Sequence, residues 1–273
     1  MLASQTVDTT GTISYNCTGG AANTAVRICI SLGNFTGAVR TMTRGGAGSL
    51  EFQIYQDAAR SIVWGNTTTP TIMTIDTTFN ASGVASGSVT MYGRILAGQT
   101  GEQDGSYTRT MSGGGGQRLT FTTNMANACT AVTTGARNFS FTASATISNL
   151  CNVSASTLNF GSQINLTANV DQSSTIQAQC TNSTPYNIGL NAGTGAGATV
   201  TTRKMTSGAI AIDYSLYRDV ARSQVWGITI GTNTVSATGN GSTQNHTVYG
   251  RVPVQTTPDP ATYSDTINVT VTY

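Results

Sequence analysis

The sequence has little charge and no long hydrophobic run. Lys, Arg, Asp and Glu make up 9% of the 273 residues, and the formal net charge is +2. Proteins that bind nucleic acid through its phosphates need a basic stripe, which these few scattered charges do not provide. No apolar stretch approaches the roughly 20 residues of a transmembrane helix. The opening residues Met1–Ser4 show neither the basic nor the apolar part of a signal peptide.

Side chains that carry out catalysis are also scarce. His246 is the only histidine and lies in a polar stretch, while Glu51 and Glu102 are the only glutamates. A lone histidine without a nucleophile motif is far more often a surface residue than a catalytic one. Residues Gly113–Gly116 lack the Lys-Ser/Thr pair of a phosphate-binding loop. We therefore expect no enzymatic activity, no cofactor and no metal site.

Glycine, threonine, serine and asparagine are abundant instead, with 31 glycines in the chain. Apolar residues alternate with threonine and serine over many short segments, a pattern with the period of a β-strand. Few segments show helical spacing. The sequence predicts an all-β protein built as two-sheet sandwiches.

An internal repeat organises the chain. Residues Ile54–Gly65 recur as Leu216–Gly227, and 8 of the 12 positions are identical. Four further matches keep the same order at nearly the same offset: 13–18 with 176–181, 40–45 with 203–208, 90–94 with 247–251, and 107–110 with 263–266. A period this long indicates two copies of one domain. We expect domains at 1–148 and 149–273, joined by a very short linker.

One segment of the first repeat has no counterpart in the second. It is Asn138–Ile147, whose apolar side chains share one face: Phe139, Phe141, Ala143, Ala145 and Ile147. We expect one more strand here, closing the first domain. A strand swapped into the second domain is the rival interpretation, which the three-residue linker makes difficult. The second repeat stops at Tyr273 without such a strand, so we expect its sandwich to have an open edge.

The five cysteines are Cys17, Cys29, Cys129, Cys151 and Cys180. They form no Cys-x-x-Cys pair, so disulfides in an oxidising compartment are favoured over zinc. The repeat pairs Cys151 with Cys180, and elimination pairs Cys29 with Cys129; a local Cys17–Cys29 bridge is the alternative. The position equivalent to Cys151 falls before Met1. We therefore expect a truncated start that lacks the partner of Cys17, the alternative being a free, buried thiol.

A turn recurs in both repeats, with Asp57 and Arg60 in the first and Asp219 and Arg222 in the second. We expect each Asp and Arg to form an ion pair that stabilises its turn, because a functional site would not be duplicated in two domains with different roles.

Several motifs resemble a known family. They are Cys151–Gly161, Gln179–Thr181, Leu216–Asp219 with Val225–Gly227, Val248–Arg251 and Asp265–Tyr273. They are similar to the spore coat protein U domain, which forms the subunits of archaic, Csu-type chaperone–usher pili. The resemblance covers 151–273 almost fully and 12–112 more weakly. The tandem pair resembles a two-domain tip adhesin, in which an adhesin domain precedes a pilin domain.

The resemblance implies two tandem immunoglobulin-like sandwiches, of which the second lacks its last strand. A periplasmic chaperone and then the next subunit supply this missing strand, with assembly at an outer-membrane usher. It implies secretion through the periplasm to a fimbrium at the cell surface, and a role in attachment and biofilm formation. A secreted carbohydrate-binding or spore-coat protein is the alternative function. A chain with an open sheet edge needs such a partner, because an unpaired edge aggregates.

Two sets of residues follow as expected sites. The donor-strand groove of the second domain should be flanked by its first and last strands, with the inward residues Leu158, Phe160, Ile267, Val269 and Val271. The loops that touch an abiotic or host surface should carry apolar residues beside turn formers: Ile72, Met73, Ile95, Leu96 and Met111.

Overall fold

The computed structural model describes residues 5–33, 39–45, 47–66, 69–112, 116–133 and 135–273. The chain forms two compact units. The first, called the first domain, contains residues 5–99 and 105–147; the second domain contains Thr100–Asp104 and Ser148–Tyr273. The regular elements of both domains are almost all strands, which confirms the predicted all-β class. Within the described residues, we find no helix with the length and hydropathy of a membrane span.

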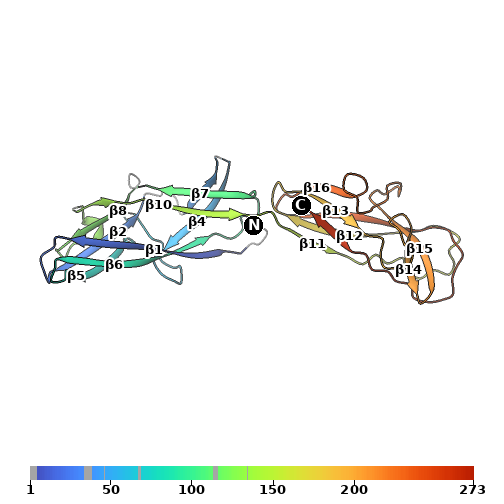
Figure 1. Ribbon diagram of the computed structural model, residues 1–273, viewed down its shortest axis with the longest axis horizontal. Helices are drawn as coiled ribbons and strands as arrows, with labels where there is room; N and C mark the ends of the chain where they lie inside the picture. The colour runs from blue at the N-terminus through green and yellow to red at the C-terminus, as the bar shows by residue number, and fades with distance from the viewer. Residues whose placement is uncertain (1–4, 34–38, 46, 67–68, 113–115, 134) are drawn as a thin grey trace. The chain divides into compact units, whose positions relative to one another are not determined.

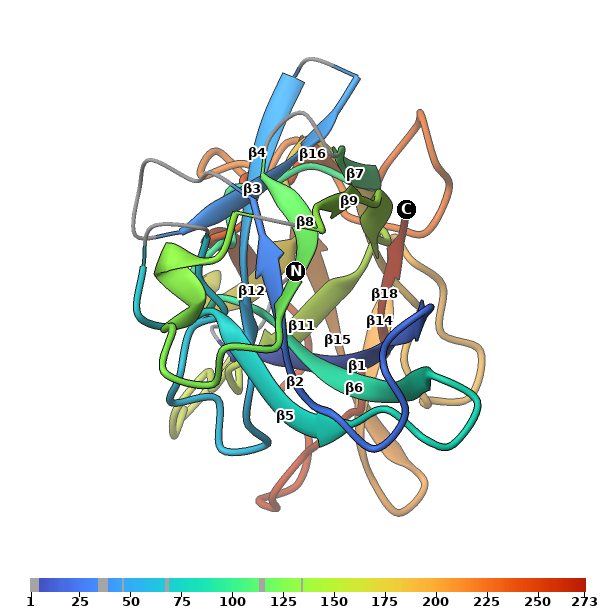
Figure 2. The same cartoon turned by 90° about the vertical axis from the view of Figure 1, so that its left-hand side faces the viewer.

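The first domain is a sandwich of two sheets (Figures 1 and 2). The larger sheet has the order β1 (Val7–Thr18), β6 (Val84–Ile95), β4 (Ala47–Tyr55), β3 (Arg40–Arg44), β7 (Gly105–Met111) and β10 (Phe141–Ile147). The smaller sheet has the order β5 (Met73–Thr78), β2 (Ala25–Leu32), β8 (Gln117–Thr122) and β9 (Arg137–Asn138).

The second domain repeats this plan with two differences. Its larger sheet has the order β11 (Cys151–Ala155), β12 (Val170–Cys180), β17 (Thr243–Val252), β15 (Ile210–Tyr217) and β14 (Arg203–Ser207). Its smaller sheet has the order β16 (Val235–Thr238), β13 (Pro185–Leu190) and β18 (Val269–Thr272). Among the described residues, β11 has no counterpart in the first domain, and the second domain has no strand equivalent to β7, β9 or β10.

The repeated tryptophan and a buried arginine organise each core. The indole N–H of Trp226 donates to the carbonyl of Ile188 over 2.8 Å, and the fully buried Arg203 donates to the carbonyl of Trp226 over 2.7 Å. Trp64 and Arg40 make the matching bonds in the first domain, to Ile30 and to Trp64. Burial lowers the pKa of Arg203 to about 10, so the guanidinium stays charged at neutral pH and its N–H groups satisfy backbone carbonyls inside the sandwich.

The recurring turn is stabilised differently from our prediction. The Asp57 carboxylate accepts hydrogen bonds from the amides of Ser61 and Ile62, at 3.0 and 2.8 Å. The guanidinium of Arg60 instead reaches Asp8 on β1, at 3.3 Å. The predicted Asp57–Arg60 pair is therefore wrong, because the carboxylate is engaged by its own turn and the arginine, with φ near 56°, ties the turn to the sheet.

The second repeat shows the same correction. Asp219 accepts from the amides of Ser223 and Gln224, at 3.0 and 2.7 Å. The ion pair of Arg222 is with Asp171 of β12, at 3.3 Å. In both domains the arginine links the turn to a strand that lies about 50 residues away in sequence, a contact that no local pattern could indicate.

The predicted closing strand at 138–147 is split between the two sheets. Residues Arg137–Asn138 form β9 beside β8, and Phe141–Ile147 form β10, antiparallel to β7. The side chains of Phe141, Ala143 and Ala145 are half-buried and that of Ile147 is buried, so they face inward as the alternation indicates. The segment therefore closes the first domain along both sheets.

Two disulfides join the pairs that the sequence analysis favoured. The sulfurs of Cys29 and Cys129 are bonded, and so are those of Cys151 and Cys180, which lie opposite each other on β11 and β12. Cys17 is free and half-buried on β1, opposite Ala85. Burial raises the pKa of the Cys17 thiol, which makes it less reactive.

The Cys29–Cys129 bridge fastens a segment that we call the strap, residues 123–136 without the undescribed residue 134. The strap lies over the outer face of β2, where Val132 packs against Cys29 and Ile72. Arg27 of β2 donates to the carbonyl of Asn127 in the strap, at 2.9 Å. The outer face of the smaller sheet is thus covered in the first domain.

The residues expected to form exposed adhesive loops do not do so. Ile72 and Met111 are only 5% and 6% exposed. Met73 begins β5 and pairs with Ile30, and Ile95 ends β6 and pairs with Phe52, while Leu96 follows it and is also half-buried. The prediction of exposed loop residues is therefore wrong for the buried Ile72 and Met111, whereas Met73, Ile95 and Leu96 are half-buried at or beside strand ends.

Candidate strand-binding groove

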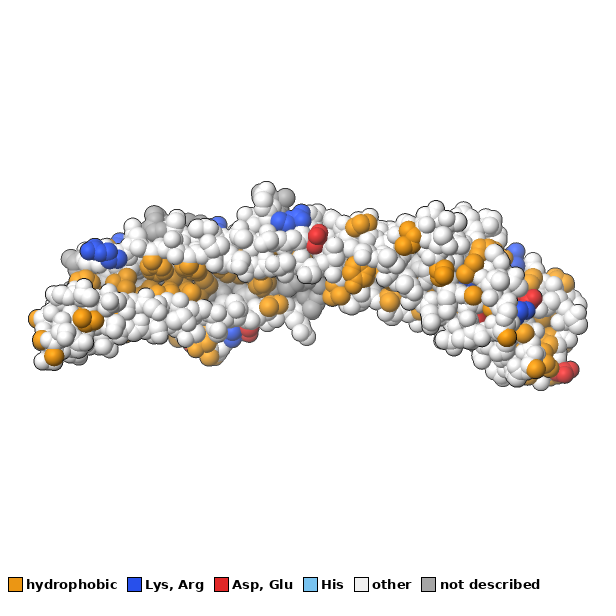
Figure 3. All heavy atoms as spheres, viewed as in Figure 1, with side chains coloured by type: hydrophobic (Ala, Val, Ile, Leu, Met, Phe, Trp, Pro, Cys, Tyr) orange, Lys and Arg blue, Asp and Glu red, His pale blue; other side chains and the backbone are white. Residues whose placement is uncertain are grey.

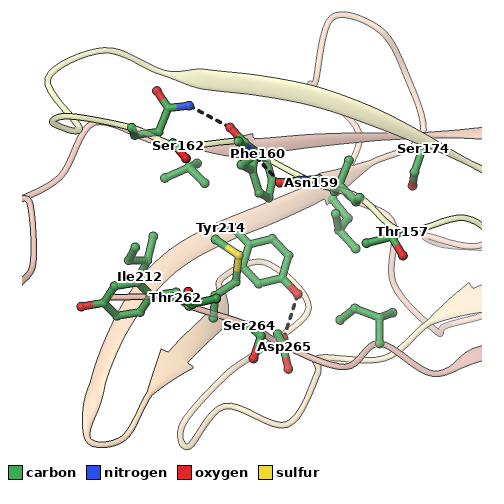
Figure 4. Close-up of a pocket in the computed structure, with 18 of the residues that line it drawn as sticks. Thr157, Asn159, Phe160, Ser162, Ser174, Ile212, Tyr214, Thr262, Ser264 and Asp265 are labelled. Atoms are coloured by element: carbon green, nitrogen blue, oxygen red, sulfur yellow. Dashed lines mark hydrogen bonds between the residues drawn. The ribbon is translucent and has the colours of Figure 1, made fainter. Parts of the chain in front are cut away.

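A cavity of about 940 Å³ opens in the second domain (Figure 4). One wall is the segment after β11, which contributes Leu158 and Phe160. The opposite wall is the stretch 257–267, together with Val269 at the start of β18. The floor is apolar and comes from β14, β15 and β17, with Met205, Ile212, Tyr214, Leu216, Val248 and Val252. We call this cavity the acceptor groove.

Glycine in the repeated Tyr-Gly-Arg motif shapes the first wall. A Cβ atom on Gly250 would lie 2.5 Å from the Leu158 side chain and 2.9 Å from the Phe160 ring. Only glycine allows this approach, so the motif lets the wall segment pack directly on β17. The ring of Phe160 also meets that of Tyr214 edge to face, with centroids 6.1 Å apart.

Asp265 holds the second wall in place. Its carboxylate accepts hydrogen bonds from the amide and hydroxyl of Thr194, at 2.7 and 2.9 Å, and from the Tyr214 hydroxyl at 2.8 Å (Figure 4). Burial is the largest cause that raises the pKa of Tyr214, so its hydroxyl remains a donor. The wall is thus anchored to β15 and to the loop after β13, and the Asp265 charge is compensated by hydrogen bonds.

The second wall has an unpaired edge. Ser264 forms a bridge to Thr206 of β14, as Thr108 of β7 does to Thr43 in the first domain. This places 261–267 at the position of β7. In the first domain, β7 pairs along its other side with all of β10. In the described residues of the second domain, no strand occupies the equivalent position, and the acceptor groove lies there instead.

The structure brings together four of the five predicted groove residues. Leu158, Phe160, Ile267 and Val269 line the groove. Val271 is one step further along β18, pairs with Ile188 and packs on the core, so it is not part of the lining. The prediction also missed the floor and the Asp265–Tyr214 bond. Alternation in β15 could have identified Ile212 and Tyr214, but only the fold brings Asp265 to them.

The chemistry of the groove suits an extended polypeptide. Its lining is mostly apolar or neutral, and Asp259 and Asp265 are its only charged residues. Ile267 and Val269 are half-buried, so their apolar surface is available to an incoming side chain. The unpaired edge of 261–267 offers backbone donors and acceptors. A β-strand can use both at once, whereas a compact ligand uses only the pocket.

Besides Asp265 and Tyr214, two further titratable side chains are in contact in the core of this domain, Tyr186 and His246. The hydroxyl of Tyr186 and Nε2 of His246 are 2.9 Å apart. His246 is half-buried and its pKa is lowered by burial. A lowered histidine pKa means that the folded state prefers the neutral ring. We therefore expect the second domain to lose stability as the pH falls through the ordinary histidine pKa of 6.5.

The measurement is the urea midpoint of this domain at about pH 8 and about pH 5. The wild-type chain should unfold at lower urea at the acidic pH, and His246→Gln, which keeps a polar group beside Tyr186, should reduce that difference. An equal pH dependence in both proteins would contradict the assignment to His246.

Comparison with known proteins agrees with this architecture. The family model described as "Spore Coat Protein U domain" matches residues 1–113 and 137–270. The chain belongs to the spore coat protein U domain family. No curated protein sequence matches the chain at a significant level. The second match begins at residue 137 and so includes β9 and β10, although these strands fold into the first domain. The strap lies between the two matched regions.

Two solved structures match this spore coat protein U family member, and the first of them shows the same fold. One is the chaperone–tip adhesion subunit pre-assembly complex CsuC–CsuE, from the archaic chaperone–usher Csu pili of Acinetobacter baumannii. The match has 18% identity, covers 96% of this chain and 91% of that chain, and has a TM-score of 0.57. Another is the CupB6 tip adhesin of Pseudomonas aeruginosa, with 12% identity, 97% and 86% coverage and a TM-score of 0.41.

Proposed function

We propose that this protein is a chaperone–usher pilus subunit whose second domain receives a β-strand from another polypeptide in the acceptor groove. The observation that carries the proposal is the contrast between the two repeats. In the first, β10 lies along β7 and buries its alternating side chains. In the second, the equivalent position beside 261–267 is an apolar groove. A domain with this groove stays incomplete until a strand enters it.

The chain itself supplies an example of such strand donation. The second family match begins at residue 137, so β9 and β10 belong in sequence to the second unit but complete the fold of the first. If the completing strand came from a separate subunit instead of from the same chain, it would join the two subunits in a fibre. The strand donors in the proposal are a periplasmic chaperone during transport and a neighbouring subunit after assembly at an outer-membrane usher.

The first domain then has a different role. Its closing strand is already present, and it therefore needs no donor along β7. A subunit with one closed and one accepting domain fits the end of a fibre, which supports a tip adhesin that contacts an abiotic or host surface in biofilm formation. Much of the surface visible in Figure 3 is neither charged nor apolar. Secreted carbohydrate-binding or coat proteins would not require the open groove.

The test compares an inward and an outward substitution in the same wall. Ile267→Asp places a charge at a half-buried side chain of the groove, and its matched control Thr266→Asp places one at the neighbouring exposed side chain, which borders the groove. Each variant is co-expressed in the periplasm with the chaperone of a chaperone–usher system. Ile267→Asp should lose co-purification with the chaperone, since a charge buried beneath an inserted strand is unfavourable, while Thr266→Asp should retain it.

Near-ultraviolet circular dichroism, which reports the packing of Trp226 together with that of Trp64, separates loss of capture from loss of folding. Retained packing with lost capture in Ile267→Asp supports the proposal. Equal capture of both variants would show that the groove is not the strand site.

A further inference from the structure

A second cavity, of about 310 Å³, lies on the outer face of the smaller sheet in the second domain. Its floor is polar and consists of Asn187, Gly189 and Asn191 from the β13 region with Asn268, Thr270 and Thr272 from the β18 region. Ile228 and Ile230 stand beside this floor and are 56% and 53% exposed. We call this cavity the outer groove. Ile228 and Ile230 place two exposed apolar side chains together at the edge of this groove.

The first domain shows what covers the equivalent face. Cys29 of β2 and Asn187 of β13 are equivalent, because each precedes the residue whose carbonyl accepts the tryptophan N–H. Their partners across the sheet are Thr120 and Thr272. Thr120 is only 4% exposed beneath the strap, whereas Thr272 is exposed. The outer groove is therefore the place that the strap fills in the first repeat.

Strand β18 connects the two grooves. Val269 of β18 faces the acceptor groove, and Thr270 and Thr272 face the outer groove. The edge of β18 away from β13 is unpaired in the described residues, whereas the equivalent β8 pairs with β9. In the first domain a single continuous segment, 123–147, crosses the outer face as the strap, passes the edge of β8 as β9, and enters the sandwich as β10.

We propose that the two grooves of the second domain bind one continuous segment of a partner polypeptide. This inference rests on the proposed acceptor groove and extends it. The N-terminal part of the segment is uncharged and carries an apolar side chain, as Val132 does in the strap, which packs beside Ile228 and Ile230. The chain then passes the edge of β18. Its C-terminal part runs antiparallel to 261–267 as a strand.

The first domain also defines the register and the inward side chains of that strand. Met111 pairs with Phe141, and Tyr107 pairs with Ala145. Through the repeat, these positions of β7 correspond to Ile267 and Tyr263. The partner residue opposite Asp265 is then equivalent to Ala143, which faces Arg109. The inward-facing side chains of the partner strand are therefore large and apolar at both ends of the strand and small in the middle. There the Asp265–Tyr214 hydrogen bond narrows the acceptor groove.

The experiment uses the full chain and two fluorescent peptides with this protein's own sequence. The short peptide is residues 137–147, and the long peptide is residues 123–147 with Cys129→Ser. Both should bind, and the long peptide should bind about tenfold more tightly because it also covers the outer groove. The double variant Ile228→Ser with Ile230→Ser should remove that advantage and leave the short peptide unaffected. The matched control is Val220→Ser with Val254→Ser, two exposed valines that line neither groove.

A disulfide trap locates the strand. In a Cys17→Ser background, Thr266→Cys should crosslink to a short peptide carrying cysteine in place of Thr142, since Thr110 and Thr142 are the equivalent pair in the first domain. A cysteine in place of Ser144 should crosslink poorly. Trapping of the short peptide without any advantage of the long one would overturn the joined-groove inference and leave the acceptor groove intact. Failure of both peptides to bind or crosslink would reject both proposals.

Discussion

Extending the chain after Tyr273 with a second copy of residues 123–147, carrying Cys129→Ser, will convert the second domain into a closed sandwich. The extension begins where β18 ends, as the strap begins after β8. Its strand would bury side chains equivalent to Phe141 and Ile147, each contributing about 1.5–3 kcal/mol when fully buried. We expect a gain on the order of 5 kcal/mol before the cost of ordering the added residues.

Differential scanning calorimetry measures the result. The transition of the second domain should rise by about 10 °C or more, given the size of the domain, and that of the first domain should not move. The extended protein should also stay soluble when it is expressed without a chaperone, because the edge of 261–267 is then paired. The control carries Phe141→Asp and Ile147→Asp in the appended copy only. If this control stabilises the domain equally, the added residues act without entering the groove.

Arg203→Met will destabilise the second domain by about 3–5 kcal/mol. The fully buried guanidinium donates to the carbonyls of Leu190, Asn191, Val200 and Trp226, at 2.7–3.1 Å. Methionine fills similar space but donates no hydrogen bond, so these acceptors would lose their partner inside the sandwich. Because Arg203 also supports the chain beside the groove, strand binding should weaken together with stability.

Hydrogen-exchange mass spectrometry reports the two domains separately and is the measurement of choice. Arg203→Met should accelerate exchange in β13 and β15 but not in β2 and β4. Arg40→Met, the matched variant of the first repeat, should show the opposite pattern. Destabilisation of both domains by either variant would mean that they unfold as one unit, and an unchanged second domain would contradict the role of Arg203.

The pairing of repeats explains why much of the fold could be predicted. Alternation along β10 and β18 indicates strands, because the side-chain period of a strand is local. Cys151 and Cys180 could be paired from the repeat. Cys180 aligns with Cys17, and the position equivalent to Cys151 falls before Met1. The absence in the second repeat of a segment equivalent to 138–147 predicted an incomplete sandwich before any contact was known.

Other features could not be predicted from the sequence because they depend on contacts between residues that are distant along the chain. Asp265 reaches Tyr214 across 51 positions, and Arg60 reaches β1 across a similar separation, so neither partner has a local signal. Ile72 and Met111 were expected in exposed loops because glycine, proline and threonine lie near them. Both are buried, because the strap covers Ile72 and β10 packs beside Met111.

The sequence by itself thus predicted two all-β repeats, the Cys151–Cys180 pair and a strand at 138–147 without a counterpart in the second repeat, since repetition and alternation are local properties. The tertiary structure decided which residues line the acceptor groove and what holds its walls in place. Segment 257–267 became a groove wall through hydrogen bonds to Thr194 and Tyr214. The outer groove lies next to the acceptor groove because β18 presents alternate side chains to both, and that depends on how the sheet is packed.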